Sequence, residues 1–213
     1  MYYKRLMRFM PDERKNQLQK VIDTLRIGGR SEKTIDKETF NKIFDDESNL
    51  KHKCWLLLAY SSGLRAEEIA ELKIEYINSN QNQLKVFGKR KKERFTVLTN
   101  VTIKYLRQFY RTTYYYPARC KSGYLFEGNQ CAEHISSSTI SNYFTALKYK
   151  YDLPENVTFH SLRHSFASNF IKAGGDPFVL KSMMGHSSLS TTSIYIHMGR
   201  DFNNLKGVKY DEI

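Results

Sequence analysis

The sequence His160-Ser-Leu-Arg163, followed by Gly185-His186-Ser-Ser and by Ser190-Thr-Thr-Ser-Ile-Tyr195, decides how the whole chain is interpreted. It gathers an arginine, two histidines and a tyrosine into one short segment. A guanidinium offers a phosphate a planar fork of donors that stays protonated at neutral pH. A tyrosine hydroxyl beside that phosphate is a candidate nucleophile. The stretch therefore predicts a site that handles a phosphodiester.

Helix signals place the first of these groups at the start of a helix. Leu162, Phe166 and Phe170 are four residues apart, which predicts a buried stripe on a helix that ends at Gly174-Gly175. Since His160 and Arg163 are three residues apart, we expect both to project from the same side of its first turn.

The two helices that follow carry the remaining groups. Asp176-Pro177 is typical of a helix start, and Gly185 is typical of a helix end. His186 is therefore predicted in a tight turn directly after a helix. Ser190 is predicted to cap a last helix that bears Tyr195 in its second turn.

A second candidate phosphate ligand follows the most apolar part of the chain. The run from Leu50 to Tyr60 predicts a buried helix that ends near Gly63. Arg65 then stands at the start of a short helix whose apolar residues are expected to face inward, Ile69 and Leu72 among them. Helix N-termini favour anions. Taken alone, Arg65 is better explained as an exposed helix-start residue paired with Glu68, three residues on, and the other motifs of the chain reverse that preference.

Residues 83–87 and 94–98 predict a β-hairpin with a cationic tip. The tip carries the candidate DNA-contacting residues Arg90, Lys91 and Lys92, and Arg94 follows at the start of the second strand. A lysine at such a tip, Lys89 for example, is a mobile point charge that can enter a groove. A solvated turn remains the alternative for this run of charges, and spacing alone does not choose among the lysines.

The remaining segments predict further amphipathic helices, and the fold class is therefore mainly α with a small β-hairpin (α+β). The predicted helices lie near residues 12–27, 37–44, 100–114 and 137–151. On the helix over 100–114 we expect Val101, Tyr105, Leu106 and Phe109 to form the buried side. The tyrosines of 114–116 are expected to pack within an irregular connection, and stacking on bases is the alternative.

Composition favours a polyanion as partner. The chain has 213 residues, with 34 Lys and Arg against 22 Asp and Glu and a net charge of +12, and its pI is about 9.5. Double-stranded DNA is the leading candidate. The longest apolar run, Cys54 to Tyr60, is far shorter than the roughly 20 residues that span a bilayer. Without a secretory pattern at Met1 to Pro11, we expect a cytoplasmic protein and no membrane partner.

The cysteines predict neither disulfides nor a cofactor. Cys54, Cys120 and Cys131 are odd in number and contain no Cys-x-x-Cys pair, which is typical of reduced thiols. Cys120, Cys131 and His134 form the one candidate metal set, but they lack a fourth ligand at standard spacing. Idle thiols and no metal are therefore the preferred interpretation.

Four motifs together resemble the catalytic domain of the tyrosine recombinases, the family of phage and transposon integrases and Xer enzymes. They are Ser62-Gly-Leu-Arg65 with Glu68, Gly88-Lys89-x-x-Lys92-Glu93-Arg94 followed by Val97-Leu98, His160-x-x-Arg163-His-Ser-Phe-Ala, and Met184-Gly185-His186-Ser-Ser-x-Ser-Thr-Thr-x-x-Tyr195. Each motif alone is a weak or moderate signal. Their common order and spacing over about residues 37–200 make a strong one. The resemblance implies the fold of a DNA breaking-rejoining enzyme.

The resemblance also implies a role for each candidate catalytic residue. Tyr195 would attack the scissile phosphate and form a 3′-phosphotyrosyl bond, without metal or ATP. Arg65 and Arg163 would hold the non-bridging oxygens, and His186 would donate a further hydrogen bond. His160 would act as general base, and Lys89 would donate a proton to the leaving 5′ oxygen. Glu68 would orient the arginines without contacting the phosphate itself. His164 and His197 are expected to have only packing roles.

The N-terminal end of the chain departs from the family pattern, and the C-terminal end extends beyond the motifs. The resemblance leads us to expect a separate DNA-clamping domain of about a hundred residues before the catalytic domain. Only residues 1–36 precede the match, and we interpret them as a helix and basic loop left from such a domain after an internal deletion. A naturally small recombinase, like the fimbrial-switch enzymes, is the alternative. The catalytic domain is predicted over 37–200 and a tail over 201–213, which the family uses in assembling tetramers on DNA; the free protein is expected to be a monomer.

The predicted function is that of a site-specific DNA recombinase or integrase of a mobile element, acting through a phosphotyrosyl intermediate. Two alternatives stay open. One is a type IB topoisomerase-like activity, which uses the same tyrosine chemistry to relax supercoils. The other is an internally truncated relic that binds DNA as a regulator.

Overall fold

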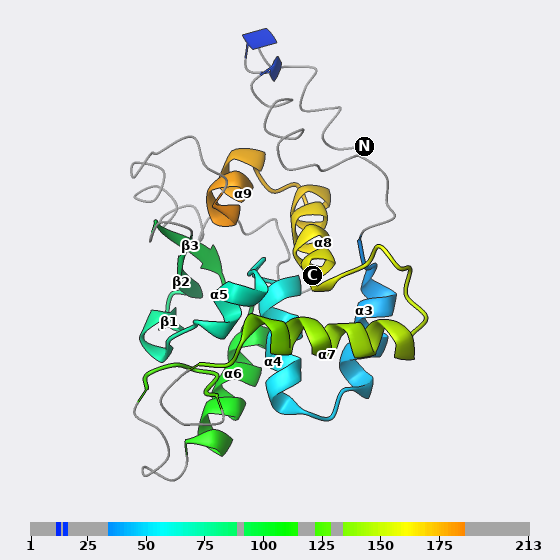
Figure 1. Cartoon of the computed structure of the whole chain (residues 1–213). Coiled ribbons are helices and arrows are strands. Elements are labelled where there is room, and N and C mark those ends of the chain that lie inside the picture. Colours follow the sequence, from blue (N-terminus) through cyan, green and yellow to red (C-terminus); the bar gives the residue numbers. More distant parts are fainter. Residues whose placement is uncertain are drawn as a thin grey trace.

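The computed structural model describes residues 12–13, 15–16, 34–88, 92–114, 122–128 and 134–185. Within these residues the chain is mainly helical with one small sheet (Figure 1). The predicted α+β class is therefore confirmed. The predicted helix near 12–27, the hairpin tip and everything after Gly185 lie wholly or mostly outside the described residues.

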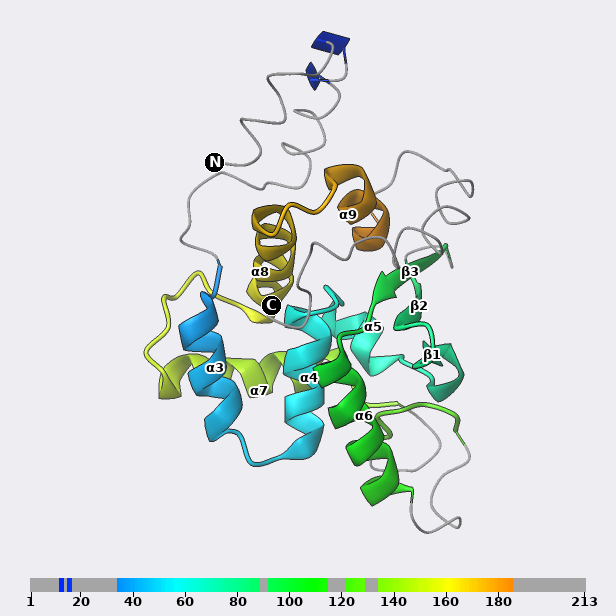
Figure 2. The same cartoon turned by 180° about the vertical axis from the view of Figure 1, so that it is seen from behind.

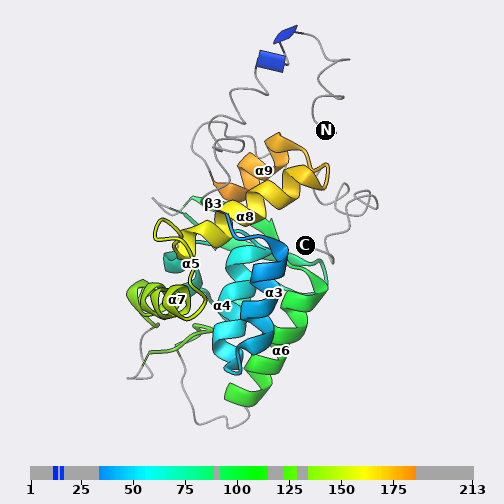
Figure 3. The same cartoon turned by 90° about the vertical axis from the view of Figure 1, so that its right-hand side faces the viewer.

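Three helices with neighbouring axes form the centre of the domain. They are α3 (Lys37–Asp46), α4 (Leu50–Tyr60) and α6 (Asn100–Thr113), and they run side by side in Figures 1 and 3. Each begins at a residue whose side chain accepts a backbone N–H of the first turn: Asp36, Asn49 and Thr99. α4 is buried from Cys54 to Tyr60, because α6 and α8 pack against it. The prediction of a buried helix over residues 50–60 is therefore confirmed.

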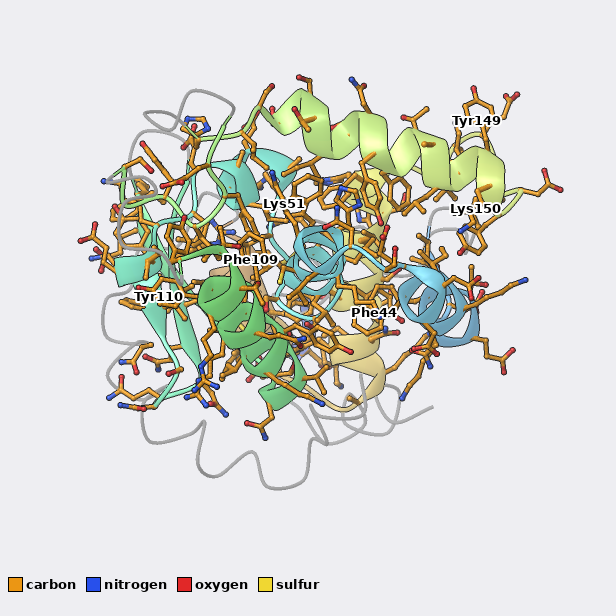
Figure 4. The ribbon with its side chains drawn as sticks, turned by 90° about the horizontal axis from the view of Figure 1, so that it is seen from below. Phe44, Lys51, Phe109, Tyr110, Tyr149 and Lys150 are labelled. Carbon is orange, nitrogen blue, oxygen red and sulfur yellow. The ribbon has the colours of Figure 1, made fainter. Side chains whose placement is uncertain are left out.

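Helix α7 (Ser137–Lys150) runs crosswise over one side of this group (Figures 1 and 4). Ser136 caps it, its side chain accepting the backbone N–H of Ser138. Ile140, Phe144 and Leu147 face the core. Tyr149, by contrast, lies at the C-terminal end of α7 on the outside of the molecule and is 77% exposed (Figure 4).

The sheet lies beside the helices and has three antiparallel strands in the order β1-β2-β3. They are β1 (Ile77–Asn78), β2 (Gln83–Phe87) and β3 (Glu93–Val97), and Gln83 pairs with Val97 at the open end of the hairpin. The hairpin is confirmed. The two-residue strand β1, which follows the short 3-10 helix η2 (Ile74–Tyr76), is too short for a sequence pattern to predict.

Helices α8 (Phe159–Lys172) and α9 (Pro177–Met184) cover one end of the domain, and α9 packs against β3 (Figures 1 and 2). Their apolar side chains form a second core with Val97. The predicted stripe of Leu162, Phe166 and Phe170 is fully buried. Asp176 and Gly185 bound α9 as expected, with Gly185 in the left-handed region at φ 64°.

One predicted core residue is wrong. Val101 is 40% exposed, whereas Ile103, two residues later, is 5% exposed. Thr102 beside it is buried because its hydroxyl bonds to Ser61 and Thr99. The first turn of α6 is therefore rotated toward a polar contact that hydrophobic periodicity does not detect.

Candidate active site

The start of α5 (Ala66–Ala70) positions Arg65 and Glu68 together. Arg65 is the N-cap, with extended backbone (φ −82°, ψ 158°), so its side chain leaves the helix end at an angle. Glu68 accepts the Arg65 backbone N–H on Oε2 at 2.8 Å and the Arg65 Nη1 on Oε1 at 2.8 Å. The simple pairing predicted for these two residues is therefore present, but it is not their only contact.

Arg94 from β3 binds the same carboxylate from the other side. Its Nη1 and Nη2 donate to the two oxygens of Glu68, each at 2.8 Å, and its Nε donates to the carbonyl of Met183 at 2.7 Å. The residue is 3% exposed. The prediction that Arg94 contacts DNA is therefore corrected, because this guanidinium lies in the interior and points at Glu68.

Arg163 from α8 completes the cluster. Its Nη1 donates to the carbonyl of Gly63 and its Nη2 to that of Met184. Its Nη1 also lies 3.8 Å from Glu68 Oε2. Two arginines far apart in the sequence, Arg65 and Arg163, thus converge on one carboxylate, which is the geometry expected of a shared anion site.

Gly63 makes the approach of Arg163 possible. Its φ is +70°, and a Cβ there would lie 2.5 Å from a ring carbon of Phe166. Only glycine lets the chain turn here at low cost while α8 packs this closely. The Ser62-Gly63 turn therefore brings the end of α4 against the helix that carries Arg163.

The four charged groups leave an excess of positive charge. Burial alone would raise the pKa of Glu68, but the hydrogen bonds and charge of Arg94, the Arg65 N–H and the charge of Arg163 lower it to about 2. Burial, with the charge of Arg65, lowers the pKa of Arg163 to about 9, which leaves it protonated at neutral pH. Three cations thus face one anion, and the site favours a further anion.

His160 lies in the first turn of α8 beside these cations. Its ring meets that of His164 edge-on, with 4.8 Å between centroids. Partial burial, and then the charges of His164, Arg163 and Arg65, lower the pKa of His160 to about 4. The imidazole is therefore neutral at physiological pH and can accept a proton.

The other candidate residues lie outside the described residues: Lys89, Arg90, Lys91, His186 and Tyr195. Lys92, the last residue of the predicted cationic tip, is described and exposed. What sequence reasoning missed is the burial of Arg94. Its burial appears only in the folded strand β3, where Arg94 and Thr96 lie on one face and both are buried, Thr96 donating to the carbonyl of Ser62.

The described residues bear only in part on the cysteine, metal and membrane predictions. Cys120 and Cys131 lie outside the described residues, and the residues that are described contain no group of three or more side chains arranged to hold a metal. Cys54 is buried within α4, which raises the pKa of its thiol to about 12. Among the described helices, none has the length and apolar character needed to cross a bilayer.

Comparison with known proteins identifies the family. The phage integrase family model matches residues 33–200. Tyrosine recombinase XerC of Actinobacillus succinogenes is 30% identical over 184 residues, which is 84% of this chain and 60% of that protein. Tyrosine recombinase XerA of Pyrococcus horikoshii is 32% identical over 164 residues, 76% of this chain and 56% of that protein. The chain thus spans little more than half the length of these relatives.

Solved structures show the same fold. A crystal structure of XerA recombinase superposes with a TM-score of 0.65 at 22% identity, covering 81% of this chain and 65% of that one. The integrase from mycobacterium phage Brujita has a TM-score of 0.63 at 21% identity, with 85% and 60% coverage. The matched residues include all three arginines around Glu68, and the chain belongs to the phage integrase family of tyrosine recombinases.

Proposed function

We propose that this chain is a site-specific DNA recombinase that cuts and rejoins strands through a covalent bond to Tyr195. The observation that carries the proposal is the convergence of Arg65 and Arg163 beside a neutral His160, in a member of the tyrosine recombinase family. Glu68 occupies the centre of that cluster.

The reaction is a transesterification in which bonds and protons balance. The Tyr195 oxygen forms a bond to the scissile phosphorus, and the bond from phosphorus to the 5′ oxygen breaks. His160 takes the phenol proton, and Lys89 gives a proton to the departing 5′ oxygen. The energy of the phosphodiester stays in the phosphotyrosyl bond. Attack by a 5′-hydroxyl of another strand reverses the step and gives recombination.

The two arginines have different access to an incoming phosphate. The Arg65 side chain is 34% exposed, whereas Arg163 is 1% exposed. Arg65 therefore meets the phosphate first, and Arg163 engages after a local displacement. Both then stabilise the negative charge that develops on the phosphorane-like transition state, together with His186.

The neutral state of His160 supports its role as the base. A protonated imidazole has no lone pair with which to accept the phenol proton. The same cations that lower its pKa are the ones that a phosphate would neutralise. Arrival of DNA is thus expected to raise the pKa of His160 toward the working pH, where a general base is most effective.

DNA as the partner rests on the charge of +12 and on the family. One structure with this fold is the XerH recombinase bound to its difH substrate, with a TM-score of 0.61 and 22% identity, covering 76% of this chain and 48% of that one. For this chain we propose duplex DNA contacted by Arg90, Lys91 and Lys92 of the hairpin. We also propose a tetramer on DNA, joined through residues 201–213.

The test is a pool of nicked duplexes of randomised sequence that trap a cleaved strand. The wild-type protein is expected to form an adduct that survives denaturing electrophoresis, and sequencing the trapped DNA identifies the target. Tyr195→Phe removes the nucleophile without removing the ring, so it should bind the same DNA and form no adduct. An adduct that persists in Tyr195→Phe contradicts the assignment of the nucleophile.

Two outcomes would favour the alternatives. DNA binding by the wild type with no adduct indicates a regulator that has kept the fold alone. An adduct with relaxation of supercoiled plasmid, but without exchange between two copies of the selected site, indicates a topoisomerase-like enzyme.

A further inference from the structure

The guanidinium of Arg94 makes all of its hydrogen bonds inside the protein. All three of its nitrogens donate, two to Glu68 and one to the Met183 carbonyl. At 3% exposure it has no surface to offer a DNA phosphate. Its charge must therefore act on the site itself.

The first thing that Arg94 controls is the direction in which Glu68 points. Arg94 binds both carboxylate oxygens, while Arg65 Nη1 binds one of them at 2.8 Å and Arg163 Nη1 stands 3.8 Å from the other. If Arg94 were absent, the carboxylate would be free to turn fully onto these two cations. It would then compete with a phosphate for the donors that the phosphate needs.

The second feature that Arg94 controls is the last turn of α9. Arg94 holds the carbonyl of Met183, and Arg163 holds that of Met184, so two cations bind consecutive free carbonyls at a helix C-terminus. Gly185 follows with φ 64°, and a Cβ there would lie 2.9 Å from Arg94 Cδ. The end of α9 is thus fitted around the Arg94 side chain.

We propose that Arg94 is a positioning residue of the phosphate site: it binds both oxygens of Glu68, which keeps that carboxylate off Arg163, and it anchors the end of α9 to β3. The inference rests on the proposed function and deepens it. It replaces the DNA-contact role that a basic residue beside the hairpin tip would otherwise receive.

The test compares Arg94→Met with Arg94→Lys in single-turnover cleavage at saturating DNA and in DNA affinity across salt concentrations. Arg94→Met is expected to lower the cleavage rate by about 100-fold, the usual order for a misplaced charged site, with DNA affinity and its salt slope unchanged. Arg94→Lys should recover part of the rate, because one ammonium cannot bind both oxygens. Lys104→Met, which removes an exposed charge on α6, is the matched control and should change neither quantity.

The competing explanations give different results. A DNA contact predicts weaker binding and a salt slope reduced by about one, with an unchanged rate at saturation. A merely structural role predicts a lower melting temperature and, below that temperature, an unchanged rate. Either result would overturn the proposal. The double variant Glu68→Gln/Arg94→Met guards against misfolding, since it removes both charges of the buried pair and should melt at a higher temperature than Arg94→Met alone.

A measurement without turnover separates this inference from the proposed function. A wild-type protein that forms no adduct contradicts the recombinase proposal but leaves the geometry of Glu68 open to test. In Arg94→Met, Glu68 is expected to turn toward Arg163, and its charge then raises the pKa of His160, observed by nuclear magnetic resonance. An unchanged His160 pKa would contradict the positioning role whatever the activity. The neighbouring charges to be kept constant are Arg65 on α5 and Arg163 and His164 on α8.

Discussion

Glu68 carries an unusual share of the interactions at the site. It holds Arg65 and Arg94 directly and lies within 3.8 Å of Arg163. With three guanidinium groups around one carboxylate, loss of the carboxylate leaves like charges facing each other in a buried space. Breaking a buried pair in this way typically costs about 3–5 kcal/mol.

Acid should therefore destabilise the protein in part through Glu68. Its folded pKa of about 2 lies below the ordinary 4.5, so its contribution to stability is complete above about pH 4.5 and is lost as the pH falls toward 2. We expect the free energy of unfolding, measured by urea titration, to fall across this window. Glu68→Gln should be less stable at pH 7 and should show a shallower fall. Parallel pH curves for the two proteins would contradict this.

His160 should titrate well below an ordinary histidine. Its pKa of about 4 predicts that the ring stays neutral from pH 7 down to about pH 5, which a titration followed by nuclear magnetic resonance can measure. His164→Ala should raise this pKa, because the charge of His164 is one of its causes. A His160 pKa near 6.5 in the free protein would show that neither burial nor the neighbouring cations act on it as described.

At the level of single residues, local motifs select three residues that the structure brings together. Arg65, Glu68 and Arg163 could be selected because each belongs to a recognisable pattern. Arg94 could not be placed correctly, because on a strand of alternating residues Phe95 and Val97 look like the inward face. The buried partner that reverses this, Glu68, lies 26 residues away in the sequence.

Among the elements, the end of α9 depends most on a single residue. Gly185→Ala adds a methyl group at φ 64° and within 2.9 Å of Arg94. Gly123→Ala is the matched control, since Gly123 has φ 75° and nothing within 4 Å of the added Cβ. The control should cost about 1 kcal/mol for backbone strain, and Gly185→Ala measurably more, by urea unfolding. Equal costs would show that the contact with Arg94 is easily relieved.

Helix α4 contains a buried polar atom without a partner. Trp55 is 1% exposed, and its Nε1 has no hydrogen-bond acceptor among the residues described. Trp55→Phe removes this unpaired donor along with part of the ring, so the two effects oppose each other and the loss should be about 1 kcal/mol. Trp55→Ala should cost about 3–5 kcal/mol through the cavity alone. Thermal or urea unfolding of both variants checks the difference.

The helices were predictable because each combines a cap with a periodic apolar face. Asp176-Pro177 and Gly185 bound α9 by local chemistry alone, and the stripe of α8 follows its four-residue spacing. The element that escaped prediction, β1, exists because its two residues pair with β2. A strand of this length is recognised by its hydrogen bonds to a neighbouring strand, and two residues are too few to show a hydrophobic pattern in the sequence.

At the scale of the molecule, the packed domain includes residues just before helix α3. Ile35 is 4% exposed, and its N–H donates to the Ser165 hydroxyl of α8 at 2.8 Å. Asp36 caps α3. Ile35 and Asp36 are therefore part of the packed domain, and the family match includes them, since it begins at residue 33.

Two shortened chains test the contribution of these residues. A chain that begins at Thr34 should unfold at the same urea concentration as the full protein. A chain that begins at Lys37 should lose about 3 kcal/mol, from the burial of Ile35, the bond to Ser165 and the helix cap. If residues before Thr34 also hold DNA, the first chain will show weaker binding with a reduced salt slope; unchanged binding would remove that role.

The depth of Arg163 has an energetic consequence for any phosphate that reaches it. A guanidinium in the open must shed water each time it engages an anion, and that dehydration weakens the contact. Here the backbone oxygens of Gly63 and Met184 have already replaced the water. The hydration is thus lost once, during folding, and a phosphate that reaches Arg163 after its local displacement meets a guanidinium that is already dehydrated.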